Sequence, residues 1–226
     1  MAHTCLVGHR DCDVFIRTVR DCLTNAHVES ECLEQLQPLN ATADTLRMMI
    51  TEQLVALPDD GLDRWLVRGE LQSRPWKHRT PDESSAMTGV AFAIEQWAQQ
   101  ERLERGVVLI DAYHRLSDSP DTTLGIDVSL ISSRQWAAAR HRPFVEGCPI
   151  LAAKIISQSD THETVTDAVR EYLDTGVSVV WVVDPDFETV SAYTRSEEPR
   201  LFSRGQELTA EPHLPGFRVR VAELFE

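Results

Sequence analysis

The pattern of hydrophobic and polar residues predicts alternating helices and strands from about residue 45 onward. Residues 82–104 place Met87, Val90, Ile94 and Trp97 at the spacing of one helix face. RWLVRGEL, ahead of that helix, alternates polar and apolar positions as a half-buried strand does. Apolar runs typical of strands follow it in GVVLID, LGIDVSLIS, PILAAKIIS and VSVVWVVD, with shorter strands in TVSAYTR and GFRVRVAEL.

The stretch from PILAAKIIS to VSVVWVVD has the order strand, helix, strand. Asp160 and Glu163 have the spacing of a capping box that would open the helix, and Gly176 would close it after Thr175. Thr51 is likewise expected to cap a short helix that ends before Pro58. Parallel strands joined by one helix form a right-handed crossover. The sequence therefore predicts an α/β or α+β domain with a central mixed sheet.

Residues 1–44 differ from the rest of the chain and are expected to form an N-terminal helical extension to a domain at 45–226. Residues 13–36 fit an amphipathic helix. The extension holds four of the five cysteines, but none forms a CxxC pair, so reduced thiols are favoured over a metal site. Because Met48 and Met49 directly precede the segment ITEQLVALPDD, we expect translation to begin at one of them.

Composition restricts the classes of partner. The net charge of −14 opposes non-specific binding to nucleic acid or anionic membrane by the whole molecule. Local basic residues, Arg74, Lys77 and Arg79, could still contact phosphates, although a solvated surface explains them equally well. The scattered tryptophans are expected to pack in the core or at its edge rather than stack on bases. No apolar run reaches the length of a membrane span and no secretory segment is evident, so a cytoplasmic location is expected.

Two charged residues interrupt apolar strands. Asp127 lies within GIDVSLI, and Lys154 lies within ILAAKII. A charge in an apolar setting is costly unless it is paired, so each of these residues needs a partner. An acid and a lysine on neighbouring strands are consistent with a charged site on the sheet or with a purely structural ion pair.

Several longer segments carry a resemblance to a known family. They are ITEQLVALPDDG, RGELQSRPW, PDTTLGIDVSLIS, EGCPILAAKIISQSDTHETV, EYLDTGVSVVWVVDPDFETVSAY and EPHLPGFRVRVAELF. In this order they resemble the "putative restriction endonuclease" family of the PD-(D/E)XK nuclease superfamily, over residues 45–226. The resemblance implies a restriction-endonuclease-like α/β core, a central mixed sheet flanked by helices. It also implies DNA phosphodiester hydrolysis with Mg²⁺ or Mn²⁺. Nucleases that cut both strands are often dimers, so a homodimer is a further expectation.

The resemblance also assigns site residues. Such nucleases hold a metal with an acid on one strand, a second acid on the next strand and a backbone carbonyl, beside a lysine. Asp127 matches the first acid, Glu70 matches a usual family residue, and Asp111 stands where relatives often have glutamate. The chain departs from the pattern twice: Lys154 replaces the second acid, and Ala168 replaces the lysine.

Three hypotheses follow from these departures. In the first, which we favour, the Lys154 ammonium sits where a cation would and neutralises Asp127, so the chain is a DNA-binding or partner-binding pseudonuclease. In the second, Lys154 is the catalytic lysine, and another carboxylate such as Glu171 replaces the missing acid. In the third, Asp127 and Asp111 still bind a metal weakly. Function is thus expected to be that of an impaired endonuclease or a non-catalytic relative.

Overall fold

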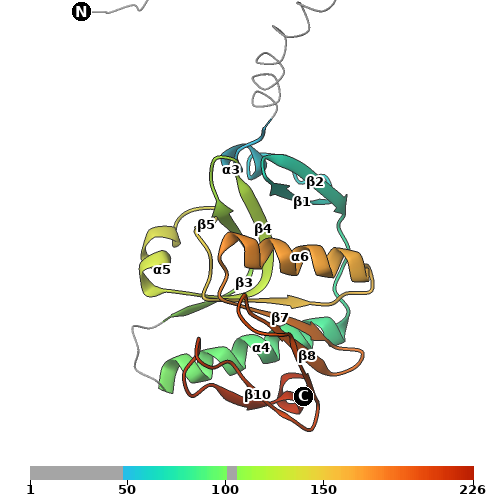
Figure 1. Cartoon of the computed structure of the whole chain (residues 1–226). Helices are drawn as coiled ribbons and strands as arrows, with labels where there is room; N and C mark the ends of the chain where they lie inside the picture. Colours follow the sequence, from blue (N-terminus) through green and yellow to red (C-terminus); the bar gives the residue numbers. More distant parts are fainter. Residues whose placement is uncertain (1–47, 101–105) are drawn as a thin grey trace, which may run out of the picture. The chain divides into compact units, whose positions relative to one another are not determined.

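The computed structural model describes residues 48–100 and 106–226 (Figure 1). The chain divides into two units, Met1–Met48 and Met49–Glu226, and the described helices and strands belong to the second unit. The predicted N-terminal helix, the extension's four cysteines and the boundary at residues 44–45 lie outside the described residues.

The elements of this unit follow one another in the order helix, hairpin, helix, strands, and a β-α-β unit. They are α3 (Thr51–Leu54), β1 (Leu62–Val67), β2 (Glu70–Pro75), α4 (Pro81–Gln100), β3 (Val107–Ser117), β4 (Thr122–Ile131), α5 (Ser133–Ala139), β5 (Val145–Glu146), β6 (Leu151–Ile155), α6 (His162–Thr175), β7 (Val179–Asp184), β8 (Thr189–Tyr193), β9 (Arg200–Ser203), β10 (Glu207–Thr209), β11 (Arg218–Arg220) and the 3₁₀ helix η1 (Val221–Leu224).

One large sheet carries the fold, with strand order β2-β1-β4-β6-β7-β8-β9 and with β3 paired to β4 and β5. The β6–β7 and β3–β5 pairs are parallel and the other pairs of this sheet are antiparallel. The helix α6 connects β6 to β7, which confirms the predicted β-α-β unit. The predicted α/β architecture with a central mixed sheet flanked by helices is therefore confirmed.

The two longest helices cover opposite faces of the sheet. Along β6, Leu151 and Ala153 pack in a cluster with α4 residues, whereas Ala152 between them packs in a cluster with α6 residues. Successive residues of a strand point to opposite faces, so the two clusters lie on the two sides of the sheet. Figure 1 shows α4 and α6 with β7 between them.

Along β4, the face of the sheet to which alternate side chains point changes at Asp127. Residues two apart should share a face, yet Ile126 packs in the α6-side cluster and Val128 packs in the α4-side cluster. On β3, the pairs on either side place Asp111 opposite Asp127, and Asp111 has φ of 54°, in the left-handed region. The charged residues of the two strands thus lie at a local bend in the sheet.

Three predicted local features are wrong. RWLVRGEL is not one strand, because Arg68 and Gly69 both have positive φ and make the two-residue turn of the β1–β2 hairpin. Thr51 does not cap α3, since the hydroxyl of Thr51 donates to the Asp121 carboxylate. Asp160 does not cap α6. Thr161 does, by accepting from the Thr164 N–H, and the Asp160 carboxylate is engaged elsewhere.

Candidate functional site

Lys154 lies near the end of β6 and points into a set of three oxygens. The Nζ atom of Lys154 is 2.8 Å from Asp160 Oδ2, 3.1 Å from the Ile155 carbonyl oxygen and 3.6 Å from Asp127 Oδ2. The Lys154 side chain is only 12% exposed. Asp127 is therefore a partner, as predicted, but the Asp160 carboxylate is closer and was not predicted.

Both carboxylate oxygens of Asp127 are engaged. Oδ1 accepts from Arg79 at 2.6 Å, and Oδ2 accepts from the Ile155 backbone N–H at 2.7 Å. Burial alone would lower the pKa of Arg79, but the Asp127 carboxylate, helped by Asp111 and Glu83, raises it. Asp127 is thus flanked by two fixed cations, one on each side of the carboxylate.

Asp160 is the most buried acid of the site, with a side chain that is 1% exposed. Its Oδ2 accepts from both the backbone N–H and the hydroxyl of Ser157. Its Oδ1 lies 3.1 Å from Nη1 of Arg74. Burial alone would raise the pKa of Asp160, but Lys154 and the Ser157 donors lower it to about 2. Asp160 is therefore firmly ionised at neutral pH.

These contacts join into a chain of alternating charges. Arg74 also binds Asp63, with 2.9 Å between Nε and Oδ2. We call the resulting set the charge network; its members, in order of contact, are Asp63, Arg74, Asp160, Lys154, Asp127 and Arg79. Three acids face three cations, so the network is neutral as a whole. Pairing of this kind is what allows charged groups to be buried at all.

The predicted site residues are only partly brought together. Asp127, Lys154, Arg74 and Arg79 all belong to the charge network. Asp111 is exposed on β3 but close enough to Arg79 to act on its pKa.

Two predicted residues lie apart from the network. Glu70 is exposed at the start of β2, four residues from Arg74, which corresponds to roughly 13 Å along a strand. Lys77 is exposed, and among the described residues it forms no ion pair.

Sequence reasoning missed three residues of the site. Asp160 was assigned to a helix cap, although its place six residues after a buried lysine was a usable signal. Asp63 reaches the network only through the β1–β2 hairpin. Glu83, buried in the first turn of α4, accepts from the Gln158 backbone N–H at 3.3 Å and holds the loop that carries Asp160.

Tyr172 of α6 is close enough to Asp127 to interact with its charge. Tyr172 is buried, and its hydroxyl donates to the Gly125 carbonyl at 3.3 Å. Burial raises the pKa of Tyr172, and the nearby Asp127 charge raises it further. Tyr172 is therefore a neutral hydrogen-bond donor beside the bend of β4 and not a proton carrier near neutral pH.

The residues present do not fit a divalent metal ion. Mg²⁺ needs oxygens at 2.0–2.1 Å, but the Asp127 and Asp160 oxygens already accept from Lys154, Arg79 and backbone donors. An ion at that distance from Asp127 Oδ2 would lie within about 6 Å of the Lys154 ammonium, where repulsion amounts to about 5 kcal/mol at an effective dielectric constant of about 20. Across residues 48–100 and 106–226, no group of three His, Cys, Asp or Glu side chains has the arrangement of a metal site.

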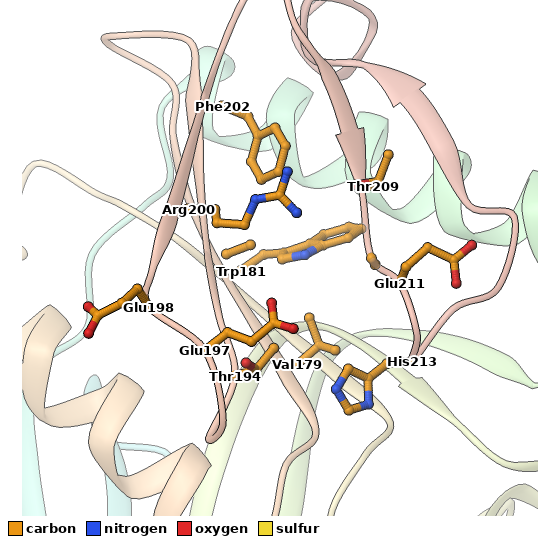
Figure 2. Close-up of a pocket in the computed structure, with 12 residues that line it drawn as sticks. Val179, Trp181, Thr194, Glu197, Glu198, Arg200, Phe202, Thr209, Glu211 and His213 are labelled. Atoms are coloured by element: carbon orange, nitrogen blue, oxygen red, sulfur yellow. The ribbon is translucent and has the colours of Figure 1, made fainter.

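A separate hollow of about 20 Å³ lies between β7, β8, β9 and the segment around β10 (Figure 2). Trp181, Thr194 and His213 are among its lining residues, and Trp181 Nε1 and Thr194 Oγ1 have no hydrogen-bond partner among the described residues. No member of the charge network lines this hollow. Its volume is about that needed for a single water molecule, so it is not the candidate site.

Comparison with known proteins now places the chain. The model of a family described as "Putative restriction endonuclease" matches residues 51–222, which is well over half of the sequence. The chain belongs to this family. A solved structure of similar fold is the crystal structure of a "putative nuclease belonging to DUF820" from Anabaena variabilis. It has a TM-score of 0.62 and 15% identity, over 77% of this chain and 96% of that one. No curated protein matches the chain.

The family match confirms the resemblance read from the sequence, and the structural match confirms the fold. The chain is a member of a nuclease family built on a restriction-endonuclease-like core. Such families generally use divalent metals, so the poor fit of a metal to the charge network is a property of this chain's own residues.

In the described part of the chain, no helix is long and apolar enough to cross a membrane.

Proposed function

We propose that this chain is a non-catalytic member of the restriction endonuclease family, in which the Lys154 ammonium takes the place of the metal ion. One observation carries the proposal. The ammonium lies against one carboxylate from β4, the backbone carbonyl of Ile155 and a second carboxylate, that of Asp160. A strand acid, a second acid and a backbone carbonyl are the ligand types that the resemblance gives to the family's metal.

The chemistry of the two cations explains why one excludes the other. An ammonium group has three donors and no acceptor, and here it is directed at oxygens that would otherwise face a hard cation. An ammonium in place of a metal ion leaves the site without a Lewis acid. No step that polarises a phosphoryl oxygen or lowers the pKa of a bound water can then occur at this position.

The lysine that relatives use for catalysis is also missing. Ala168 stands at that position and carries no charge. Lys154 is a poor substitute, because its ammonium is already bound to Asp160 and Asp127 and is almost buried. The same residue cannot both neutralise the acids and orient an attacking water.

A second candidate function is hydrolysis by a rearranged site. The observation in its favour is Asp160, a buried carboxylate beside Lys154 that could supply the missing second acid. Asp160 fits this role better than Glu171, which forms no ion pair with the charge network. In this scheme Lys154 would leave Asp160 when a metal binds and would act on the substrate.

Plasmid nicking with Mg²⁺ or Mn²⁺ separates the two candidates. We would compare the native chain, Asp127→Ala and the double change Lys154→Glu with Ala168→Lys. Glu70→Gln serves as a control outside the charge network. We expect the native chain to nick no faster than Asp127→Ala. We expect the double variant to bind Mn²⁺ in calorimetry, because it restores an acid and moves the cation to α6.

Native nicking that disappears in Asp127→Ala would refute the proposal and favour the rearranged site. Nicking that persists in Asp127→Ala would point to a contaminating nuclease. An inert double variant that nevertheless binds Mn²⁺ would still support Lys154 as the group that fills the cation position.

A further inference from the structure

Trp76, which lies between Arg74 and Arg79 in the sequence, is exposed, whereas the tryptophans were expected to pack in the core or at its edge. It lies in the segment 76–80, which leads from the end of β2 to the start of α4 (Figure 1). Its side chain is 56% exposed, whereas Trp181 is completely buried. A large aromatic ring left in water forgoes the free energy that burial would provide.

The Trp76 ring is nevertheless held in place. The backbone N–H of Trp76 donates to the Gly61 carbonyl at 2.9 Å, which holds the segment 76–80 against the loop before β1. The His78 ring packs edge-on against it, with 4.5 Å between the ring centroids and an angle of 75° between the planes. An exposed ring that is already oriented loses little conformational entropy when a partner binds.

Positive charge accompanies the ring. Lys77 lies between Trp76 and His78, is exposed, and among the described residues has no acidic partner. Arg79, the next residue after His78, is instead committed to Asp127. Lys77 is therefore the cation of this segment whose charge remains available to a ligand, in a molecule whose overall charge is −14.

We propose that Trp76, Lys77 and His78 form a binding site for single-stranded nucleic acid, in which an unpaired base stacks on Trp76 and a phosphate contacts Lys77. Surfaces that bind single strands combine an aromatic platform with adjacent cations in this way. A base inside a duplex is already stacked on its neighbours and would first have to be extruded. The exposed ring face thus favours a single strand over a duplex.

The proposal does not depend on the loss of catalysis, because none of its three residues belongs to the charge network. It predicts modest affinity with weak salt dependence. Each phosphate contacted by a single strand contributes about −0.7 to the slope of log K against log salt concentration. One contact at Lys77 therefore gives a slope of roughly −0.7.

The test is fluorescence anisotropy of a fluorescein-labelled oligo(dT) strand titrated with the full chain at low salt, with EDTA present. EDTA prevents metal-dependent cleavage, so a failure here is distinct from a failure of the proposed function. Trp76→Ala should weaken binding at least about fivefold, the lower limit for one base stacked on an aromatic ring. Trp76→Phe should recover most of that loss. Trp136→Ala, at a tryptophan that is 37% exposed on α5, is the matched control and should bind as the native chain does.

Lys77→Gln should reduce the magnitude of the salt slope by about 0.7. The proposal is overturned if the native chain does not bind the strand, or if Trp76→Ala and Trp136→Ala bind equally. It is also overturned if a duplex binds as tightly as the single strand, or if an acidic peptide such as poly-glutamate displaces the strand at equal charge. In the last case the surface would be a protein-binding site.

Discussion

Replacing Lys154 with methionine tests the central feature of this structure. Methionine keeps most of the volume of the lysine stem but removes the charge that lies between Asp160 and Asp127. Removing one partner of a buried ion pair typically costs about 3–5 kcal/mol, because the remaining charge is left without compensation. Each acid keeps one arginine, so we expect the free energy of unfolding to fall by about 3 kcal/mol, the lower end of that range.

The same substitution should create affinity for a divalent cation. With the ammonium gone, the carboxylates of Asp127 and Asp160 and the Ile155 carbonyl would face a space that a hard cation can occupy. A metal that binds only the folded state stabilises it by about 2.7 kcal/mol when its concentration is 100 times the dissociation constant. We therefore expect Mn²⁺ to restore most of the stability lost in Lys154→Met and to leave the native chain unchanged.

Urea unfolding with and without MnCl₂ measures both effects, and calorimetry gives the affinity for Mn²⁺. Lys77→Met is the matched control, because this exposed lysine has no ion pair and its loss should change stability by no more than about 0.5 kcal/mol. Two results would refute the reasoning. Lys154→Met could prove as stable as Lys77→Met, or Mn²⁺ could stabilise the native chain as much as the variant.

Three further predictions concern stability. The pKa of Asp160 is lowered to about 2 in the folded state, so its ionised carboxylate stabilises the fold by about 2 kcal/mol. This contribution is complete above the unfolded pKa near 3.8 and is lost as the pH falls through 2. Urea unfolding of Asp160→Asn at several pH values should lack this part of the acid dependence. Burial lowers the pKa of His114 to about 4, so as the pH falls the unfolded chain takes up a proton before the folded chain does. The free energy of unfolding should therefore fall by about 3 kcal/mol between pH 6.5 and 4. His114→Gln should lack this fall, and an equal fall in the variant would contradict the prediction. A Cβ at Gly89 would lie 2.3 Å from the Leu224 carbonyl oxygen, so Gly89→Ala should lower the melting temperature through overpacking of about 1–3 kcal/mol, whereas Gly205→Ala, with open space around it, should not.

Much of the fold is local in origin and could be predicted from the sequence. The apolar runs predicted β3, β4, β6 and β7. Helical spacing predicted α4, whereas helix start and stop signals predicted α6. These patterns work because a strand repeats every two residues and a helix every 3.6, so a buried face leaves a periodic trace. Asp127 and Lys154 stood out for a related reason: a charge in such a trace requires a partner.

The identity of those partners was decided by the tertiary structure. Arg74 and Asp160 are 86 positions apart, and Arg79 and Asp127 are 48 apart. They meet only because β1 lies between β2 and β4, and β6 follows β4 in the sheet. Asp160 shows the limit most clearly, since an aspartate just before a helix satisfies the capping pattern whether or not it caps. The sequence determined which charges had to be paired, and the strand order, set by packing across the whole sheet, determined with which.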